Sequence, residues 1–262
     1  MTQQEQNQQW YKWNRFQQKY EKYFEKKFVK ALHIQLAAYI KTRDVMAIPS
    51  YPIWAVLNEL YLKVGPAWAN ITRIQTKKAI GQMGFNEEIV RLMRQYYGIN
   101  LMNDAELMTA YSREVIADVL SLAAETGASI DDIVKSLLTN PEFNAMRARR
   151  IARTETVTAA NGAAMIYAQQ SGNVMEKIWI AVKDKRTRHN HKMIDGTTLP
   201  IDVPFDFKAK FKGGGYVDVQ MMQPGARFQP NGLKVPGSEV INCRCTVAFQ
   251  AKRDAAGRIV RR

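Results

Sequence analysis

Apolar residues recur every three or four positions through the first two thirds of the chain, and polar residues fill the places between them. The run from Trp10 to Thr42 shows this spacing most clearly, with Lys and Gln between the apolar residues. Such a repeat is typical of an amphipathic helix. The same reasoning predicts four shorter helices, over residues 51–64, 68–83, 86–97 and 104–126. We expect Gly65-Pro66 to end the first of these four.

Helix-capping residues mark two more helices further along. Ser129 is followed three positions later by Asp132, an acidic version of the capping box that begins many helices. Asn140-Pro141 is expected to begin a long helix that reaches about Gln170, where Ser171-Gly172 stops it. The first 172 residues are therefore predicted to be mainly helical.

The pattern changes after Gly172. Residues 175–182 alternate as a strand does, with Trp179 facing away from the neighbouring isoleucines. Residues 200–236 hold five prolines, which favours loops and short strands. Clean alternation returns over residues 241–249 and predicts a terminal strand.

These patterns predict an α+β protein, with a mainly helical N-terminal part and a small α+β C-terminal domain. We expect a helical domain over residues 1–140, an α+β domain over 141–250 and a basic, flexible tail over 251–262. The helix that begins near Pro141 would join the two domains.

The charge balance bears on the partners. Lys and Arg outnumber Asp and Glu by 38 to 24, and the excess gathers in residues 1–45, 147–192 and 250–262. Such a surface attracts polyanions, and because no base-reading motif is present we expect non-specific, phosphate-driven binding to double-stranded DNA. Solubility alone would also explain the charge. No run of eighteen apolar residues occurs, so a membrane partner is not expected.

Two segments could carry binding. The first is an arginine cluster on the helix after Pro141, where phosphate contact competes with salt bridges to Glu142, Glu155 or other helices. Its members are Arg147, Arg149, Arg150 and Arg153. The second is the region from Trp10 to Tyr23, which interleaves aromatic and basic residues. Its helical spacing favours docking on a larger partner over stacking on single-stranded nucleic acid, although packing within its own domain is also possible.

The residues from Asp184 to Asp195 concentrate charge and histidine. As a helix they would place Asp184, Arg188, His191 and Asp195 on one face, and as a strand Asp184, Arg186 and Arg188. Either way we expect a partly buried polar network that packs against the later Asn-Cys-Arg-Cys stretch. Its expected members are Glu155, Asp184, Arg186, Arg188, His191, Asp195, Asn242 and Arg244.

Two sharper hypotheses stand beside this network. His189, His191, Cys243 and Cys245 form a possible zinc ligand set, although their spacing departs from common zinc modules and buried cysteines also behave as small apolar residues. The expectation is therefore no cofactor, with zinc as the alternative. A metal-dependent nuclease or processing enzyme acting on DNA, using Glu155, Asp184, His191 and Asp195, is the alternative to a protein without enzymatic activity.

Together, these blocks resemble the phage Mu F-like head morphogenesis proteins, also called minor head proteins. The resemblance covers about residues 140–250. It rests on Ala152-Arg-Thr-Glu155, Asn161, Trp179, Asp184-x-Arg186-x-Arg188-x-x-His191, Asp195-Gly196, Phe205 and Asn242-Cys-Arg-Cys-Thr246.

The resemblance implies a structural virion protein, present in few copies in the capsid interior and in the host cytoplasm during assembly. It implies the portal protein and the major capsid or scaffold protein as partners, and a role in head assembly, DNA packaging or ejection. Some relatives carry a C-terminal toxin domain, which is not expected here because the sequence ends soon after the Cys-Arg-Cys pattern. The docking helix would then face the portal or the capsid shell.

Overall fold

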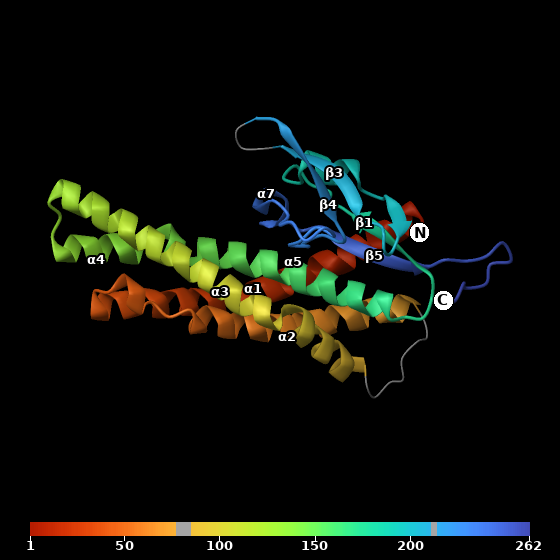
Figure 1. Ribbon diagram of the computed structural model, residues 1–262, viewed down its shortest axis with the longest axis horizontal. Helices are drawn as coiled ribbons and strands as arrows, with labels where there is room; N and C mark the ends of the chain where they lie inside the picture. The colour runs from red at the N-terminus through yellow and green to blue at the C-terminus, as the bar shows by residue number, and fades with distance from the viewer. Residues whose placement is uncertain (77–84, 211–213) are drawn as a thin grey trace.

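A long helical bundle carries a small β-rich part along one of its sides (Figure 1). The computed structural model describes residues 1–76, 85–210 and 214–262. The main helices are α1 (Gln3–Thr42), α2 (Tyr51–Thr76), α3 (Phe85–Thr126), α4 (Ile130–Thr139) and α5 (Ala145–Gln169). Short helical turns are η1 (Val45–Ala47), η2 (Pro141–Phe143), α6 (His189–Met193) and α7 (Gly237–Val240). The α+β class predicted from the sequence is confirmed.

The first helix, α1, has a capping motif at each end. Thr2 and Glu5 form a capping box at its N-terminus, and Arg43 adopts a left-handed φ of 57° at its end. Its aromatic residues mostly face inward: Trp13 packs edge-on against Trp68 of α2, and Phe24 is fully buried. Most aromatics of α1 therefore belong to the core of the bundle, while Tyr11 and Tyr23 stay exposed, and docking of α1 on an outside partner stays a prediction.

The second helix does not stop at Gly65-Pro66, contrary to the prediction, but continues to Thr76. A side chain at Gly65 would approach Met93 of α3 to 2.7 Å and Ala163 of α5 to 3.1 Å, so glycine lets these helices pack closely. This tertiary packing outweighs the helix-breaking tendency of the pair. The predicted end of the next helix, at Met83, lies outside the described residues.

The third helix merges two predicted helices into one, since residues 98–103 are helical as well. The capping box of Ser129 and Asp132 forms as predicted and begins α4. Asn144, rather than Asn140, caps α5, because the turn η2 stands between them.

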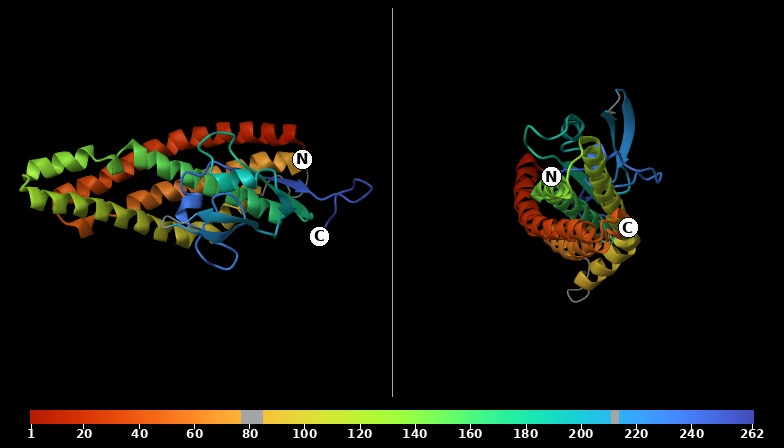
Figure 2. Two further views of the ribbon diagram at one scale, coloured as in Figure 1. Left: turned by 90° about the horizontal axis from the view of Figure 1, so that it is seen from above. Right: turned by 90° about the vertical axis from the view of Figure 1, so that its left-hand side faces the viewer.

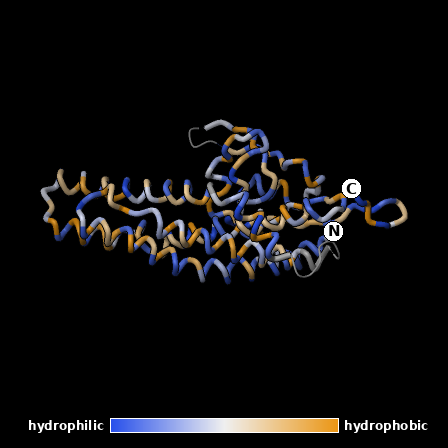
Figure 3. Tube along the Cα trace, turned by 60° about the horizontal axis from the view of Figure 1, so that its bottom comes forward, coloured by the Kyte–Doolittle hydropathy of each residue, from blue (hydrophilic) through white to orange (hydrophobic). Residues whose placement is uncertain are grey.

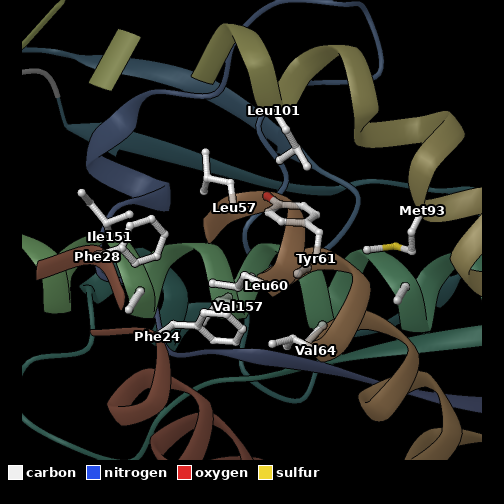
Figure 4. Close-up of a cluster of buried hydrophobic side chains, with 14 of the residues drawn as sticks. Phe24, Phe28, Leu57, Leu60, Tyr61, Val64, Met93, Leu101, Ile151 and Val157 are labelled. Atoms are coloured by element: carbon white, nitrogen blue, oxygen red, sulfur yellow. The ribbon is translucent and has the colours of Figure 1, made fainter. Parts of the chain in front are cut away.

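The core lies where α1, α2, α3 and α5 meet (Figure 4). Phe24, Leu60 and Val157 are fully buried there, one from each of three helices. Burial of a side chain of this size contributes roughly 1.5–3 kcal/mol. The predicted domain boundary at residue 140 stays a prediction, but the largest apolar cluster contains side chains from both sides of it.

Two small antiparallel sheets form the β-rich part. One has the strand order β2-β1-β5 and the other pairs β3 with β4. The strands are β1 (Met175–Ile180), β2 (Thr198–Pro200), β3 (Phe205–Lys210), β4 (Tyr216–Met221) and β5 (Thr246–Ala251). Trp179 lies opposite Val247 in the first sheet.

The predicted terminal strand is only half correct. Residues 241–245 form a turn that follows α7, and β5 begins at Thr246. Asn242 has a left-handed φ of 61°, which a continuous strand does not allow. The Cys-Arg-Cys segment is therefore an irregular loop that leads into the strand.

The last residues are not a free tail. Backbone hydrogen bonds join Val174 to Val260 and Arg262 to Gly172, and Arg253 pairs with Ile259 in a small hairpin.

Figure 3 shows apolar and polar residues alternating along the bundle helices. Among the described residues, no helix combines the length and the apolar character needed to cross a membrane.

Candidate functional site

The loop of residues 241–245 is held by side chains from three other elements. Trp13 of α1 donates its Nε1 hydrogen to the Arg244 carbonyl at 2.8 Å, and the Thr154 hydroxyl of α5 accepts from the Asn242 amide at 2.9 Å. Arg188 donates to the Ile241 carbonyl at 2.6 Å. An irregular loop has no sheet or helix partners of its own, so these contacts satisfy its backbone.

Asn161 of α5 fastens the same loop from beneath. It is fully buried, and its amide nitrogen donates to the carbonyls of Pro224 and Cys245 at 3.1 and 3.2 Å. Its oxygen accepts from the Thr246 hydroxyl at 2.8 Å and from the Val247 amide at 3.3 Å. One side chain thus joins the central helix to two separate segments of the β-rich part.

A buried histidine faces both cysteines. Nδ1 of His191 lies 3.8 Å from Sγ of Cys243 and 3.7 Å from Sγ of Cys245. On the other side of the ring, Nε2 lies 3.2 Å from a carboxylate oxygen of Glu239. Trp179 packs edge-on against the ring, with centroids 5.1 Å apart. His191, Cys243 and Cys245 are the one group of histidines, cysteines and acids in the described residues with the geometry to hold a metal ion.

The charges within this cluster support one another. Burial alone would lower the pKa of His191, but Cys243 and Glu239 outweigh burial and raise it. A hydrogen bond from Cys245, aided by His191, lowers the pKa of Cys243 well below its ordinary value. The same bond and burial raise the pKa of Cys245. One cysteine is therefore disposed to be a thiolate.

The predicted polar network divides into separate groups. Asp184 pairs with Arg244 at 2.6 Å and more loosely with Arg186 at 3.8 Å. The helical face expected to hold both His191 and Asp195 does not form, because the residues from Asp184 form a turn before the short helix α6. Asp195 instead accepts from Lys183 and from the Ala181 amide. His189 is exposed and lies outside the metal group.

Glu155 belongs to a third group, which sequence analysis did not anticipate. It accepts from Arg227 and from the Tyr61 hydroxyl, and Arg227 also pairs with Asp104. Burial raises the pKa of Asp104 to about 6, although Arg227 works against this shift. The group borders a cavity of about 790 Å³ between α3, α5 and residues 222–241.

Arg227 and Glu239 had no signal in the sequence, because they lie in segments without a regular apolar pattern and their partners are distant along the chain. Glu239 is the carboxylate partner of His191, and Arg227 the cationic partner of Glu155. Such pairs follow from the tertiary fold alone.

All four arginines of the cluster have partners within the protein. Arg147 is buried, donates to the Met108 carbonyl at 2.6 Å and stacks on Tyr111, so its expected contact with DNA is wrong. Burial lowers its pKa to about 10. The other three arginines form ion pairs of 2.7–2.9 Å, Arg149 with Glu25, Arg150 with Glu142 and Arg153 with Glu21.

With this geometry in view, the comparisons with known proteins identify the family. Residues 114–248 match the profile of the family described as phage Mu protein F like protein. The chain belongs to this family. The match runs from the second half of α3 into the first half of β5, so the family unit includes Asn161, Trp179 and the Cys-Arg-Cys loop. Membership places the protein among phage head morphogenesis proteins and in the context of virion assembly.

Two relatives extend this finding. The chain is 33% identical over 146 residues to the uncharacterized protein YqbB of Bacillus subtilis (strain 168), a stretch of 55% of this chain and 44% of YqbB. It is 30% identical over 125 residues to NAD(+)--arginine ADP-ribosyltransferase EFV of Enterococcus faecalis (strain ATCC 700802 / V583), a stretch of 46% of this chain and 22% of that protein. The matched stretches span less than half of both relatives. No solved structure matches the chain significantly.

Proposed function

We propose that the protein is a minor head protein, a structural component of a phage virion that lies in the capsid interior beside the portal. In this proposal it binds the portal protein and the major capsid or scaffold protein. It aids head assembly and the packaging or ejection of DNA, and it catalyses no reaction. It is made in the host cytoplasm and then enclosed in the head. The family match over residues 114–248 carries the proposal.

The roles of the residues that carry the sequence resemblance support a structural protein. Asn161 anchors the Cys-Arg-Cys loop, Trp179 covers His191, and Arg244 pairs with Asp184. Each of these side chains is engaged inside the protein and holds one segment to another. A folded unit maintained in this way is suited to assembly rather than to chemistry.

The nuclease alternative finds little support. Its four expected residues have separate partners: Glu155 has Arg227, Asp184 has Arg244, Asp195 has Lys183, and His191 has Glu239. A two-metal or histidine-assisted nuclease needs its carboxylates to converge on one site. Within the described residues, the carboxylates of Glu155, Asp184 and Asp195 form no candidate metal site with His191.

A basic stripe on α1 supports the DNA-binding part of the proposal. It consists of six exposed residues, Lys12, Arg15, Lys19, Lys22, Lys26 and Lys30. At 100° per residue these positions fall within an arc of about 80°, and they span about 27 Å along the helix. None of the six forms an ion pair with a described acid. Figure 2 shows α1 along a long outer edge of the molecule. We call this surface the α1 stripe.

The α1 stripe replaces the arginine cluster as the proposed site of phosphate contact. None of its charges is paired with a described acid, whereas those of Arg149 and Arg153 are already paired with acids of α1. The buried aromatics on the opposite face hold α1 rigid, so the stripe presents a fixed row of cations. Such a row contacts a DNA backbone without reading its sequence.

Fluorescence anisotropy with two unrelated DNA duplexes at rising salt tests this surface. Six phosphate contacts predict a slope of about −5 for log K against log salt. A triple variant with Lys19, Lys22 and Lys26 changed to Gln should reduce that slope by about 3. The control changes three other exposed lysines to Gln, Lys135, Lys185 and Lys208, and should retain it. Equal slopes for both variants would assign the binding to net charge alone.

Genetics tests the head function directly. Deleting the gene from the phage or prophage that encodes the chain should leave heads that are absent, aberrant or empty of DNA by electron microscopy. Supplying the intact gene in trans should restore them. Normal numbers of DNA-filled, infectious particles from the deletion strain would contradict the proposal.

A further inference from the structure

The geometry of the histidine–cysteine cluster points to a metal site, and we propose that His191, Cys243 and Cys245 bind one zinc ion that fixes the Cys-Arg-Cys loop to α6. The three residues lie outside the α1 stripe, and zinc binding to them requires neither DNA binding nor the proposed role in the phage head. Imidazole nitrogen and thiolate sulfur are ligands that zinc prefers.

The distances fit a shared tetrahedral ion. With Zn–S near 2.3 Å and Zn–N near 2.0–2.1 Å, tetrahedral angles place ligand nitrogen and sulfur about 3.6 Å apart. Nδ1 of His191 lies 3.8 and 3.7 Å from the two sulfurs, and all three ligand atoms lie within 4.8 Å of one another. The three side chains thus surround one point at zinc-binding distances without further movement of the backbone.

Glu239 supplies what a zinc-bound histidine requires on its far side. Its carboxylate lies 3.2 Å from Nε2, the nitrogen that would not bind the metal. It is held by Asn190, which donates to it at 2.7 Å. A carboxylate in this place fixes the ring orientation and raises the basicity of the ligating nitrogen.

Burial makes the site structural. His191 is 1% exposed and both cysteines 2% exposed, so no substrate reaches the cluster. Trp179 and Phe207 close it with edge-on contacts to the imidazole. Three protein ligands leave one position for a small donor such as water. Zinc binding requires both cysteines as thiolates and Nδ1 of His191 without a proton, so binding releases whatever protons these three groups still hold, and the two thiolates then balance the charge of the ion.

The zinc would complete the loop's attachment. Trp13, Asn161 and Thr154 already bind backbone atoms of this loop from the helical side. The metal would bind its two side chains from the opposite side, through α6. Because α6 has five residues and no side-chain cap, the ion would also be its principal anchor.

Metal analysis of the untagged full-length chain tests the proposal. We expect about one zinc per chain after purification without chelator. After removal of the zinc, titration with Co²⁺ should produce an intense thiolate-to-cobalt absorption band that saturates at one equivalent and disappears on addition of Zn²⁺. A zinc-free chain that gives no such band, or a chain whose cysteines form a disulfide, would overturn the proposal.

Variants locate the ion. Cys245→Ser should abolish the cobalt band, and Glu239→Gln should keep it while weakening zinc affinity 10- to 100-fold in competition with a chelator. The second variant remains informative if the first fails to fold. His189→Ala is the matched control, since His189 is an exposed neighbour outside the cluster. Loss of zinc in His189→Ala with retention in Cys245→Ser would refute the assigned ligands.

Discussion

Asn161 offers the sharpest test of how α5 holds the β-rich part. Its side chain makes four hydrogen bonds inside the protein, two to carbonyl oxygens and two from donors of β5. In Asn161→Ala the Pro224 and Cys245 carbonyls and the Val247 amide lose this partner, whereas the Thr246 hydroxyl can turn to another acceptor. Each buried group left without a partner costs about 1–3 kcal/mol. For these three groups we expect the free energy of unfolding to fall by at least about 3 kcal/mol.

Urea unfolding followed by tryptophan fluorescence measures this loss. Asn161→Leu separates hydrogen bonding from volume, because leucine fills the space of asparagine without offering a hydrogen bond. It should destabilise the protein about as much as alanine does. Asn14→Ala is the control, since its amide oxygen accepts from Gln18 in a solvent-exposed hydrogen bond, and the variant should stay within about 0.5 kcal/mol of wild type. An Asn161→Leu variant as stable as wild type would refute the reasoning.

Three further variants test separate parts of the account. The Arg244 hydrogen bond lowers the pKa of Asp184 to about 2, so the stability contributed by the Asp184 charge is present above pH 4 and is lost as pH falls towards 2. In Asp184→Asn the free energy of unfolding should depend less on pH across that range. Burial lowers the pKa of Lys177 to about 8, so the folded protein loses this charge at lower pH than the unfolded chain does. The melting temperature should therefore rise as pH increases from about 8 to 10.5, and Lys177→Met should remove this rise. Trp13→Phe removes the donor to the Arg244 carbonyl and should lower the free energy of unfolding. A decrease of less than about 0.5 kcal/mol would show that this hydrogen bond is dispensable.

The helices were predictable where their causes are local. The spacing of apolar residues in α1 and the capping box at Ser129 act within a few residues, and both appear in the structure as expected. Gly65-Pro66 misled the prediction because its effect depends on Met93 and Ala163, which approach it from other helices. Local propensity is a weak guide where tertiary packing decides.

The site was predictable in its residue types but less in its pairings. The sequence marked His191, Cys243 and Cys245, and the structure brings these three together. It could not indicate Glu239, which lies in the four-residue helix α7 just before the loop, and it included His189, which is exposed.

Charge was the least predictable property. The arginine cluster suggested a DNA surface, but its partners Glu21 and Glu25 lie more than 120 positions earlier in the chain. Ion pairs over such separations depend on how α1 and α5 pack. The α1 stripe was included only in the general excess of charge near the N-terminus, and its exposure follows from the burial of the opposite aromatic face.

Quantitative mass spectrometry of purified particles tests the central claim, that this is a structural head protein, most directly. Empty proheads and DNA-filled heads of the encoding phage would be separated by density and their proteins counted against the portal protein. The account predicts this chain in both fractions, at a constant low ratio to the portal. Its absence from both, with the protein recovered only free in the lysate, would contradict the account.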